Sequence, residues 1–276
     1  MNYTSAQLKA LVKKRASGNS AKAQIIIRNY IMERFLERLS LSPYRGNLIL
    51  KGGMLISSIV GLDTRSTLDV DATVKNFPLS IESAKQIVTE IAAISLDDGI
   101  AFQLKSAEPI MDEAEYGGIR VSLEAYLENM RTPLKLDISA GHVITPHEID
   151  YRLKLMFETR TISILAYPLE TVLAEKMECI ISRGTANTRM RDFYDVYILQ
   201  SSQLIDMKVF VKALTNTSRH RGTATVLREG ALILGEVQAS SDMQRLWSAY
   251  QRKFDYAREI PWADVMASIR TLYMGA

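Results

Sequence analysis

A mixed α/β fold followed by an all-helical region is the fold class that this sequence predicts, an α+β arrangement. Alternating apolar and polar residues predict several short strands before Tyr167, with helical periodicity between them, and every segment after Pro168 has helical spacing. Proline suits the first turn of a helix, so the boundary falls at this point. We therefore predict an N-terminal lobe over residues 1–167 that opens with a basic helical segment, 1–45, and a C-terminal helical lobe over residues 168–276.

The individual elements follow from local patterns. Thr4 and Gln7 form a capping box that predicts a helix to about Ala16, and apolar spacing predicts a second helix over residues 21–39. Strands are expected at residues 48–52, 67–74, 100–106, 118–127, 133–140, 151–157 and 161–167. Further helices are expected at residues 80–95, 168–182, 190–201, 206–215, 223–236, 239–254 and 262–274.

The composition is that of an ordinary globular protein, with 47% hydrophobic and 24% charged residues. The single cysteine, Cys179, excludes an internal disulfide and a cysteine-rich zinc site, so a reducing cytoplasm is the expected compartment. The N-terminus lacks the apolar stretch of a secretory signal, and no apolar run reaches the roughly 18 residues of a membrane span.

The net charge of +3 is unevenly distributed. Residues 1–40 carry eight Lys or Arg but only two acids, Glu33 and Glu37. A second basic cluster comprises Arg183, Arg189 and Arg191. Such patches attract polyanions such as nucleic acid, although solvated helix faces would give the same pattern.

Three aspartates are candidates for metal-dependent chemistry. Asp69 and Asp71 are expected on one face of strand 67–74, and Asp137 on the polar face of strand 133–140. Carboxylates so close repel each other, and a hard divalent cation would relieve that repulsion. Two metals held by three acids suit phosphoryl or nucleotidyl transfer. The alternative is an exposed, solvated sheet face.

Residues before these acids could contact phosphate. Gly52 and Gly53 would let the backbone approach an anion closely, and a helix starting just beyond them would direct amide N–H groups at it. Arg65, Ser66 and Thr67 offer a guanidinium and hydroxyls. Each feature alone is equally compatible with a plain turn.

Two charged residues interrupt apolar helix stripes in the C-terminal region. Lys176 falls in phase with Val172 and Leu173, and Asp192 lines up with Val196 and Leu199. A lysine at such a position either extends its ammonium group to the surface or reaches into a polar cleft. We expect a cleft that the two lobes share.

Four stretches in this order resemble a known family: KGGMLISSIVGLDTRSTLDVDATV, LKLDISAG, YPLETVLAEKMECIISRG and TRMRDFYDVYIL. They are similar to the AbiEii-type nucleotidyltransferase toxins of abortive-infection systems, which are relatives of the MenT toxins and of the DNA polymerase β superfamily. The resemblance covers roughly residues 48–199. It implies a bilobed protein with a nucleotidyltransferase core and a helical bundle.

The resemblance also implies roles for individual residues. Metal-binding and catalytic positions would be Asp69, Asp71 and Asp137, with Lys176 and Asp192 as further catalytic residues and Asp195 near them. Nucleotide contacts would come from Gly52, Gly53, Arg65, Thr67 and Lys176, and RNA contacts from Arg183, Arg189 and Arg191. The superfamily more often has Gly-Ser at the glycine pair, and the stretch between the glycines and Asp69 is longer than in many members.

The resemblance implies Mg²⁺ or Mn²⁺ as cofactor, an NTP as substrate and RNA as acceptor, with the tRNA 3′ end the leading candidate. A winged-helix antitoxin of the AbiEi type would be the cognate partner, with or without direct contact, and no membrane would be involved. Blocked growth during phage infection would be the outcome. The alternatives are a catalytically inactive nucleotide- or RNA-binding module and a kinase-like phosphoryl transferase.

Overall fold

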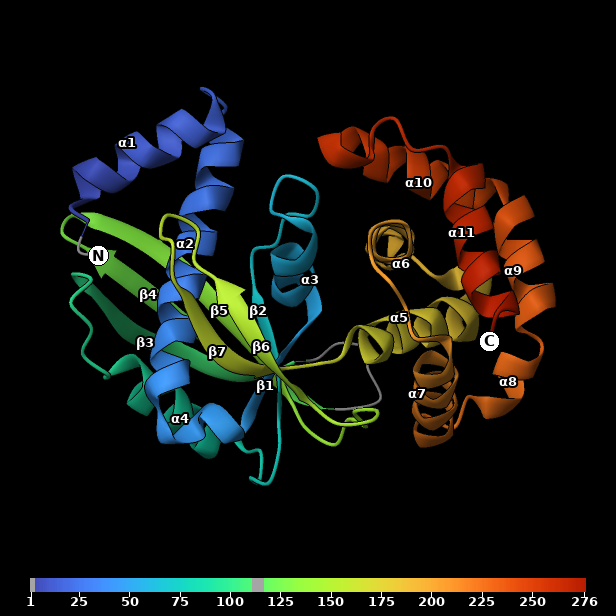
Figure 1. The fold of residues 1–276 in the computed structure, drawn as a ribbon, viewed down its shortest axis with the longest axis horizontal. Coiled ribbons are helices and arrows are strands. Elements are labelled where there is room, and N and C mark those ends of the chain that lie inside the picture. The colour runs from blue at the N-terminus through green and yellow to red at the C-terminus, as the bar shows by residue number, and fades with distance from the viewer. Residues whose placement is uncertain (1–2, 111–116) are drawn as a thin grey trace. The chain divides into compact units, whose positions relative to one another are not determined.

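The computed structural model describes residues 3–110 and 117–276, and it divides into two compact units (Figure 1). Unit 1 consists of Met1–His142 and Ile149–Ala166. Unit 2 consists of Tyr167–Ala276 together with Val143–Glu148, a segment that lies before the predicted boundary. A mixed α/β unit and a helical unit confirm the predicted fold class. None of the described helices combines the length and the apolar composition that a membrane-spanning helix needs.

Unit 1 is built on a mixed sheet. Its described strands are β1 (Leu48–Lys51), β2 (Val70–Val74), β3 (Ile100–Ile110), β4 (Gly118–Leu127), β5 (Met130–Ser139), β6 (Ile149–Lys154) and β7 (Thr161–Ala166). They lie in the order β3-β4-β5-β2-β1-β7-β6. The β2–β5 and β1–β7 pairs are parallel and the other pairs are antiparallel. The short central strands β1 and β2 are thus covered on both sides by neighbours, which fixes their position in the sheet.

Helices cover the apolar face of this sheet. Unit 1 contains α1 (Ser5–Ala16), α2 (Ser20–Leu41), α3 (Gly52–Val60), α4 (Ile81–Ala92) and the short 3₁₀ turn η1 (Pro43–Gly46). Helix α2 packs against β5 and β7, and α4 packs against β3 and β4 (Figure 1). Leu134, Leu136 and Ile138 of β5 are buried, as the alternation predicted. The residues between them in sequence therefore point to the opposite face.

Several predicted boundaries in unit 1 were wrong, among them that of the strand expected at residues 151–157, which is β6 at Ile149–Lys154. The strand expected at residues 67–74 begins only at Val70, and Leu68, expected to face the core, is 42% exposed. The Thr67 hydroxyl donates to the Asp69 carbonyl at 3.3 Å, and Asn29, on the distant helix α2, donates to the Thr67 carbonyl at 3.0 Å. These bonds hold a bend where alternation alone predicted a strand. The helix expected at residues 80–95 ends at Ala92.

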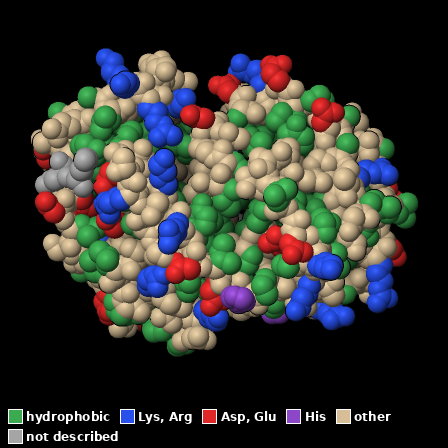
Figure 2. Space-filling view, in the orientation of Figure 1, with side chains coloured by type: hydrophobic (Ala, Val, Ile, Leu, Met, Phe, Trp, Pro, Cys, Tyr) green, Lys and Arg blue, Asp and Glu red, His purple; other side chains and the backbone are tan. Residues whose placement is uncertain are grey.

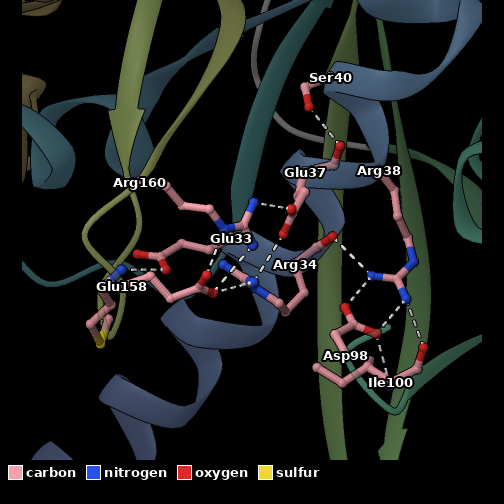
Figure 3. A network of polar contacts seen from close by, with 10 residues as sticks. Glu33, Arg34, Glu37, Arg38, Ser40, Asp98, Ile100, Glu158 and Arg160 are labelled. Carbon is pink, nitrogen blue, oxygen red and sulfur yellow. Dashed lines mark hydrogen bonds and ion pairs between the residues drawn. The ribbon is translucent and has the colours of Figure 1, made fainter. Parts of the chain in front are cut away.

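Buried charges tie helix α2 to two distant segments of unit 1 (Figure 3). Arg38 forms two bonds with the Asp98 carboxylate, at 2.7 and 2.9 Å, and donates to the Ile100 carbonyl at 2.8 Å. Arg34 pairs with Glu158 at 2.8 Å and with Glu37 at 2.9 Å. Because an unpaired charge is costly to bury, each pairing fixes α2 against the loop before β3 and against the β6–β7 turn.

This network corrects the interpretation of the basic N-terminal segment. Arg34 is 1% exposed and Arg38 is 2% exposed, so neither can contact a polyanion. Their charges are neutralised by Glu37, Asp98 and Glu158 inside the unit. Figure 2 shows Lys and Arg side chains interspersed with Asp and Glu on the face seen in that view.

Unit 2 is helical throughout its described elements. They are α5 (Leu169–Arg183), η2 (Gly184–Ala186), α6 (Met190–Ser202), α7 (Met207–His220), α8 (Ala224–Arg228), α9 (Gly230–Ala239), α10 (Ser241–Lys253), η3 (Asp255–Ala257) and α11 (Trp262–Met274). The single helix predicted at residues 223–236 is in fact two, separated at Glu229. A Cβ atom on Gly230 would lie 2.7 Å from the Tyr273 ring, so a glycine lets the start of α9 approach that ring.

The buried carboxyl group of Glu33 should make the stability of the protein depend on pH. Burial raises the pKa of Glu33 to about 7, against the opposing hydrogen bond from the Met156 amide. The native state therefore retains a proton that the unfolded state releases, and it loses stability as the pH rises from about 5 to about 8. We expect the free energy of unfolding of Glu33→Gln, relative to that of the wild type, to rise over this range by up to about 3 kcal/mol. Denaturant unfolding at several pH values measures the difference.

Glu90→Gln is the matched control for this experiment. Hydrogen bonds from Tyr44 and Gln86 lower the pKa of Glu90, so its titration lies below that range. The difference between this variant and the wild type should therefore stay constant. A constant difference for Glu33→Gln as well would contradict the prediction.

Candidate functional site

Four charged side chains form a row across neighbouring strands of the sheet. Lys51 of β1 is paired with Asp71 of β2, Asp71 with Asp137 of β5, and Asp137 with Arg120 of β4. Residues paired on adjacent strands point to the same face, so all four lie on the face opposite the apolar residues of β5. The structure thus brings the predicted Asp71 and Asp137 side by side.

Arg120 neutralises Asp137. Its Nε and Nη2 atoms donate to the two carboxylate oxygens of Asp137 at 2.8 and 2.7 Å, a bidentate pair. The Asp137 side chain is 19% exposed and that of Arg120 is 35% exposed, so the pair can be reached from solvent. In this arrangement a cation that binds Asp137 must share the carboxylate with Arg120 or replace it.

The negative charge of Asp71 is less well compensated than that of Asp137. Burial raises the pKa of the Asp71 carboxyl, the Gly53 amide opposes this rise, and the neighbouring charges of Asp137 and Asp69 add to it, while Lys51 counters them. The Gly53 N–H donates to Asp71 Oδ2 at 3.1 Å. Excess negative charge at this point is what a divalent cation would relieve.

The two glycines allow this approach. The expected helix is present, but α3 begins at Gly52 and contains both glycines, whereas the hypothesis placed its start just beyond them. Gly52 has φ +63°, and a Cβ atom there would overlap the Asp71 carboxylate. A Cβ atom on Gly53 would lie 2.6 Å from the Thr67 hydroxyl oxygen and 3.3 Å from a terminal nitrogen of Arg65. Only glycines can bring the first turn of α3 onto these side chains.

The loop between α3 and β2 is held in place from α2. Arg65 is 2% exposed and Thr67 is 4% exposed. The Arg65 guanidinium donates to the Ser66 carbonyl, and Asn29 bonds the Thr67 carbonyl. The structure therefore brings Arg65 and Thr67 to the glycine turn. Their contact with a nucleotide stays a prediction.

The acids offer the oxygen ligands that a hard divalent cation prefers, but their positions differ from those expected. Asp69 lies just before β2, not on the strand as expected, and its charge still acts on Asp71. Among the described residues, no three His, Cys, Asp or Glu are already arranged to hold a metal ion. Asp69 and Asp71 supply oxygen ligands of the kind Mg²⁺ prefers, whereas both oxygens of Asp137 are bonded to Arg120.

A second charged cluster lies within unit 2, where α5 meets α6. Lys176 Nζ lies 2.7 Å from Asp192 Oδ1 and 2.7 Å from Asp195 Oδ2. The lysine side chain is only 13% exposed and the two aspartates are buried. Lys176 and Asp192, the two charged residues that interrupt the apolar helix stripes, thus pair with each other. Whether this cluster and the acids of unit 1 act on one substrate stays a prediction.

Arginines near α6 lie in different settings. Arg189 Nε lies 2.8 Å from Asp192 Oδ2, with the arginine side chain 54% exposed. Burial works against ionisation of Asp192, but Lys176 and Arg189 outweigh it and lower the pKa of that carboxyl. Arg191 lies over the ring of Phe254. Arg183 is half-buried in the last turn of α5. Their contact with RNA stays a prediction.

Sequence reasoning missed several members of these clusters. Lys51 precedes the glycines directly and also lies 3.3 Å from His142 Nε2, and Arg120 pairs with Asp137. Asp195, which the resemblance placed near the site without a role, is as close to Lys176 as Asp192 is. The only available signal was that Arg120 occupies a polar position of an alternating strand, and many surface residues share that feature.

Comparison with known proteins identifies the family. The family model of the nucleotidyl transferase AbiEii toxin, Type IV toxin–antitoxin system, matches residues 34–268. The chain belongs to this family. This AbiEii-family chain is therefore a nucleotidyltransferase toxin by family, and the resemblance seen in the four stretches is confirmed.

Two solved structures are similar to this chain, and the first of them supports the fold. JHP933 from Helicobacter pylori has a TM-score of 0.50 at 14% identity, with 91% of this chain and 92% of that chain covered. A candidate nucleotidyltransferase from H. pylori has a TM-score of 0.48 at 15% identity, with 91% of this chain and 95% of that chain covered. No curated protein is significantly similar to the AbiEii-family chain.

The glycine turn gives a prediction for activity. Gly52→Ala should displace the Asp71 carboxylate and abolish nucleotidyl transfer, because its Cβ atom would overlap that group. The matched control is Gly61→Ala, since Gly61 also has a positive φ, +93°, but has no atom within 4 Å of the added Cβ. Both variants should lose about 1 kcal/mol of stability through backbone strain. Equal activity in the two variants would show that the close contact with Asp71 is irrelevant to catalysis.

The lysine cluster gives a prediction for stability. Lys176→Met should destabilise the protein by about 3–5 kcal/mol, because it leaves the buried Asp195 carboxylate without its cation. Adding Asp195→Asn should recover much of that loss, and denaturant unfolding measures both. The double variant then serves for activity assays. Full transfer activity in a folded double variant would exclude a catalytic role for Lys176.

Proposed function

We propose that this AbiEii-family protein is a Mg²⁺-dependent toxin that transfers a nucleotide from an NTP to an RNA acceptor, with the tRNA 3′ end as the preferred candidate. Family membership supports nucleotidyl transfer. The observation that carries the proposal within the structure is the pairing of Asp71 with Asp137 directly beside the Gly52-Gly53 turn. Carboxylates next to a close-approach turn suit chemistry at a phosphate.

Each group of unit 1 has a task in this proposal. The triphosphate lies beside the first turn of α3, next to Asp71, whose carboxylate the Gly53 N–H orients. Asp69 and Asp71 hold Mg²⁺, which would stabilise the negative charge of the α-phosphate during in-line displacement. Arg65 and Thr67 are almost fully buried against Gly53, so in this proposal they position the turn for the nucleotide.

Asp137 acts on the acceptor. Its carboxylate is adjacent to Asp71 and partly exposed, so it can accept the proton of an attacking ribose hydroxyl. Arg120 fixes the orientation of the Asp137 carboxylate through the bidentate pair. During substrate binding the carboxylate is shared between Arg120 and the reaction centre.

Lys176 offsets charge on the triphosphate. An ammonium group held by Asp192 and Asp195 has a defined position and stays charged. The two aspartates are therefore positioning residues for the lysine. The ion pair with Lys176 supports orientation of the lysine, rather than contact with a base or ribose, as the task of Asp192.

The proposal includes a biological setting. Transfer to an essential RNA would block growth in the cytoplasm, and this would limit phage multiplication during infection. A cognate winged-helix antitoxin would control the toxin. The Type IV description of the family supports an antitoxin partner.

The decisive experiment follows the label of the NTP. Wild-type protein with Mg²⁺ and α-labelled NTP should label RNA, whereas γ-labelled NTP should leave it unlabelled. Asp69→Asn together with Asp71→Asn should reduce transfer by at least about 1,000-fold, because both metal ligands lose their charge. Circular dichroism should show an unchanged fold. Incorporation of the γ label would indicate a kinase-like reaction, and binding without any transfer would indicate an inactive module.

A further inference from the structure

Two aromatic residues, Phe254 and Tyr256, form what we call the aromatic ledge, at the end of helix α10 in unit 2. Phe254 follows the last residue of α10 and Tyr256 lies in η3. Their rings are stacked at 5.4 Å with an interplanar angle of 21°. Both residues are half-buried, whereas Tyr194 and Trp247 beneath them are 1% exposed. The ledge is therefore the accessible edge of an otherwise buried aromatic cluster.

The ledge is fixed rigidly to that cluster. The Tyr256 ring lies 4.8 Å from that of Tyr194, and the Phe254 ring lies 4.6 Å from that of Tyr250. The hydroxyl groups of Tyr250 and Tyr256 lie 3.1 Å apart, within hydrogen-bond distance. A rigid ring pays little conformational entropy when a flat ligand stacks on it.

Positive charges surround these rings. The Arg191 guanidinium lies 5.1 Å from the Phe254 ring centre, and the Lys253 ammonium lies 5.6 Å from it. Arg252 is exposed beside Lys253. The acid at this position, Asp255, pairs with the exposed Arg258. The ledge thus carries a surplus of positive charge around apolar rings.

Aromatic rings surrounded by cations are typical of sites that bind single-stranded nucleic acid. Bases stack on aromatic rings and on arginine planes, while lysine and arginine hold the phosphates. A protein partner would also use aromatic residues, but several cations around two stacked rings favour a polyanion with flat groups.

Helix α6 connects the ledge to the lysine cluster. Its first turns carry Asp192, which is buried against Lys176, and Arg191, which lies on Phe254. Arg189, just before α6, pairs with Asp192 and is half-exposed. A strand bound at the ledge therefore lies within unit 2 next to the group proposed to meet the triphosphate.

We infer that Phe254 and Tyr256, with Arg191 and Lys253, form a stacking site for unpaired nucleotides at the end of the acceptor RNA. The inference rests on the proposed function, because it assigns part of the acceptor contact. It adds a subsite that selects single-stranded ends over duplexes, since only unpaired bases can reach the rings.

The test measures RNA binding by the full protein without NTP. A labelled single-stranded RNA of about 12 nucleotides and a blunt RNA duplex of the same length are titrated by fluorescence anisotropy. Phe254→Leu should weaken binding of the single strand by about 5- to 100-fold and leave duplex binding nearly unchanged. Phe102→Leu is the matched control, because Phe102 is also half-buried with an arginine, Arg38, 5.0 Å from its ring centre.

A second variant avoids any effect on folding. Lys253 is exposed, so Lys253→Gln should keep the fold while reducing the salt dependence of single-strand binding by about 0.7 in the log–log slope. Lys208→Gln, on the exposed side of α7, should change the slope less. Equal slopes for the two variants would overturn the inference.

The outcomes also separate this inference from the proposed function. If the wild type binds single-stranded RNA through Phe254 but transfers no label, the ledge stands and the proposed function fails. If the wild type transfers label while Phe254→Leu binds and reacts like it, the ledge fails and the function stands. Loss of binding to the purified cognate antitoxin with unchanged RNA binding would assign the ledge to the antitoxin instead.

Discussion

The parallel pairing of β2 with β5 is the constraint on which the site in unit 1 depends. It sets Asp71 directly beside Asp137, at the spacing of neighbouring strands, roughly 5 Å. Two carboxylates at that spacing need compensation. Arg120 compensates Asp137 from β4, and the first turn of α3 supplies an amide to Asp71. The glycine turn, the loop around it and the polar face of the sheet are all consistent with this one pairing.

Local neutralisation of charge is a general feature of both units. Helix α2 carries buried arginines whose acids come from the segment before β3 and from the β6–β7 turn. In unit 2, one ammonium group is held between two carboxylates. Charges taken out of water need partners close by, so each cluster also orders the segments that contribute to it. A count of basic residues along the chain consequently overstates the charge available to a ligand.

Helix α6 shows how one element can serve two purposes. Residues on its inner side hold the lysine of α5, and Arg191 on another side covers the Phe254 ring. The 3.6-residue period separates these neighbours in sequence onto different faces. A change in the orientation of α6 would therefore affect both the lysine cluster and the aromatic ledge. In the proposed function, this coupling would link the residue that meets the phosphates to those that meet the acceptor strand.

The sequence by itself determined the strands with clear alternation, such as β4 and β5, most helices of unit 2, and the family, because local periodicity and motif order are carried by neighbouring residues. Only the tertiary structure decided which charges meet. Arg120 with Asp137, Lys51 beside Asp71, and the burial of Arg34 and Arg38 all join segments far apart in the chain. It also decided that Asp69 precedes β2, because Asn29 of α2 holds the bend there. Such contacts depend on strand register and helix packing, which no local pattern specifies.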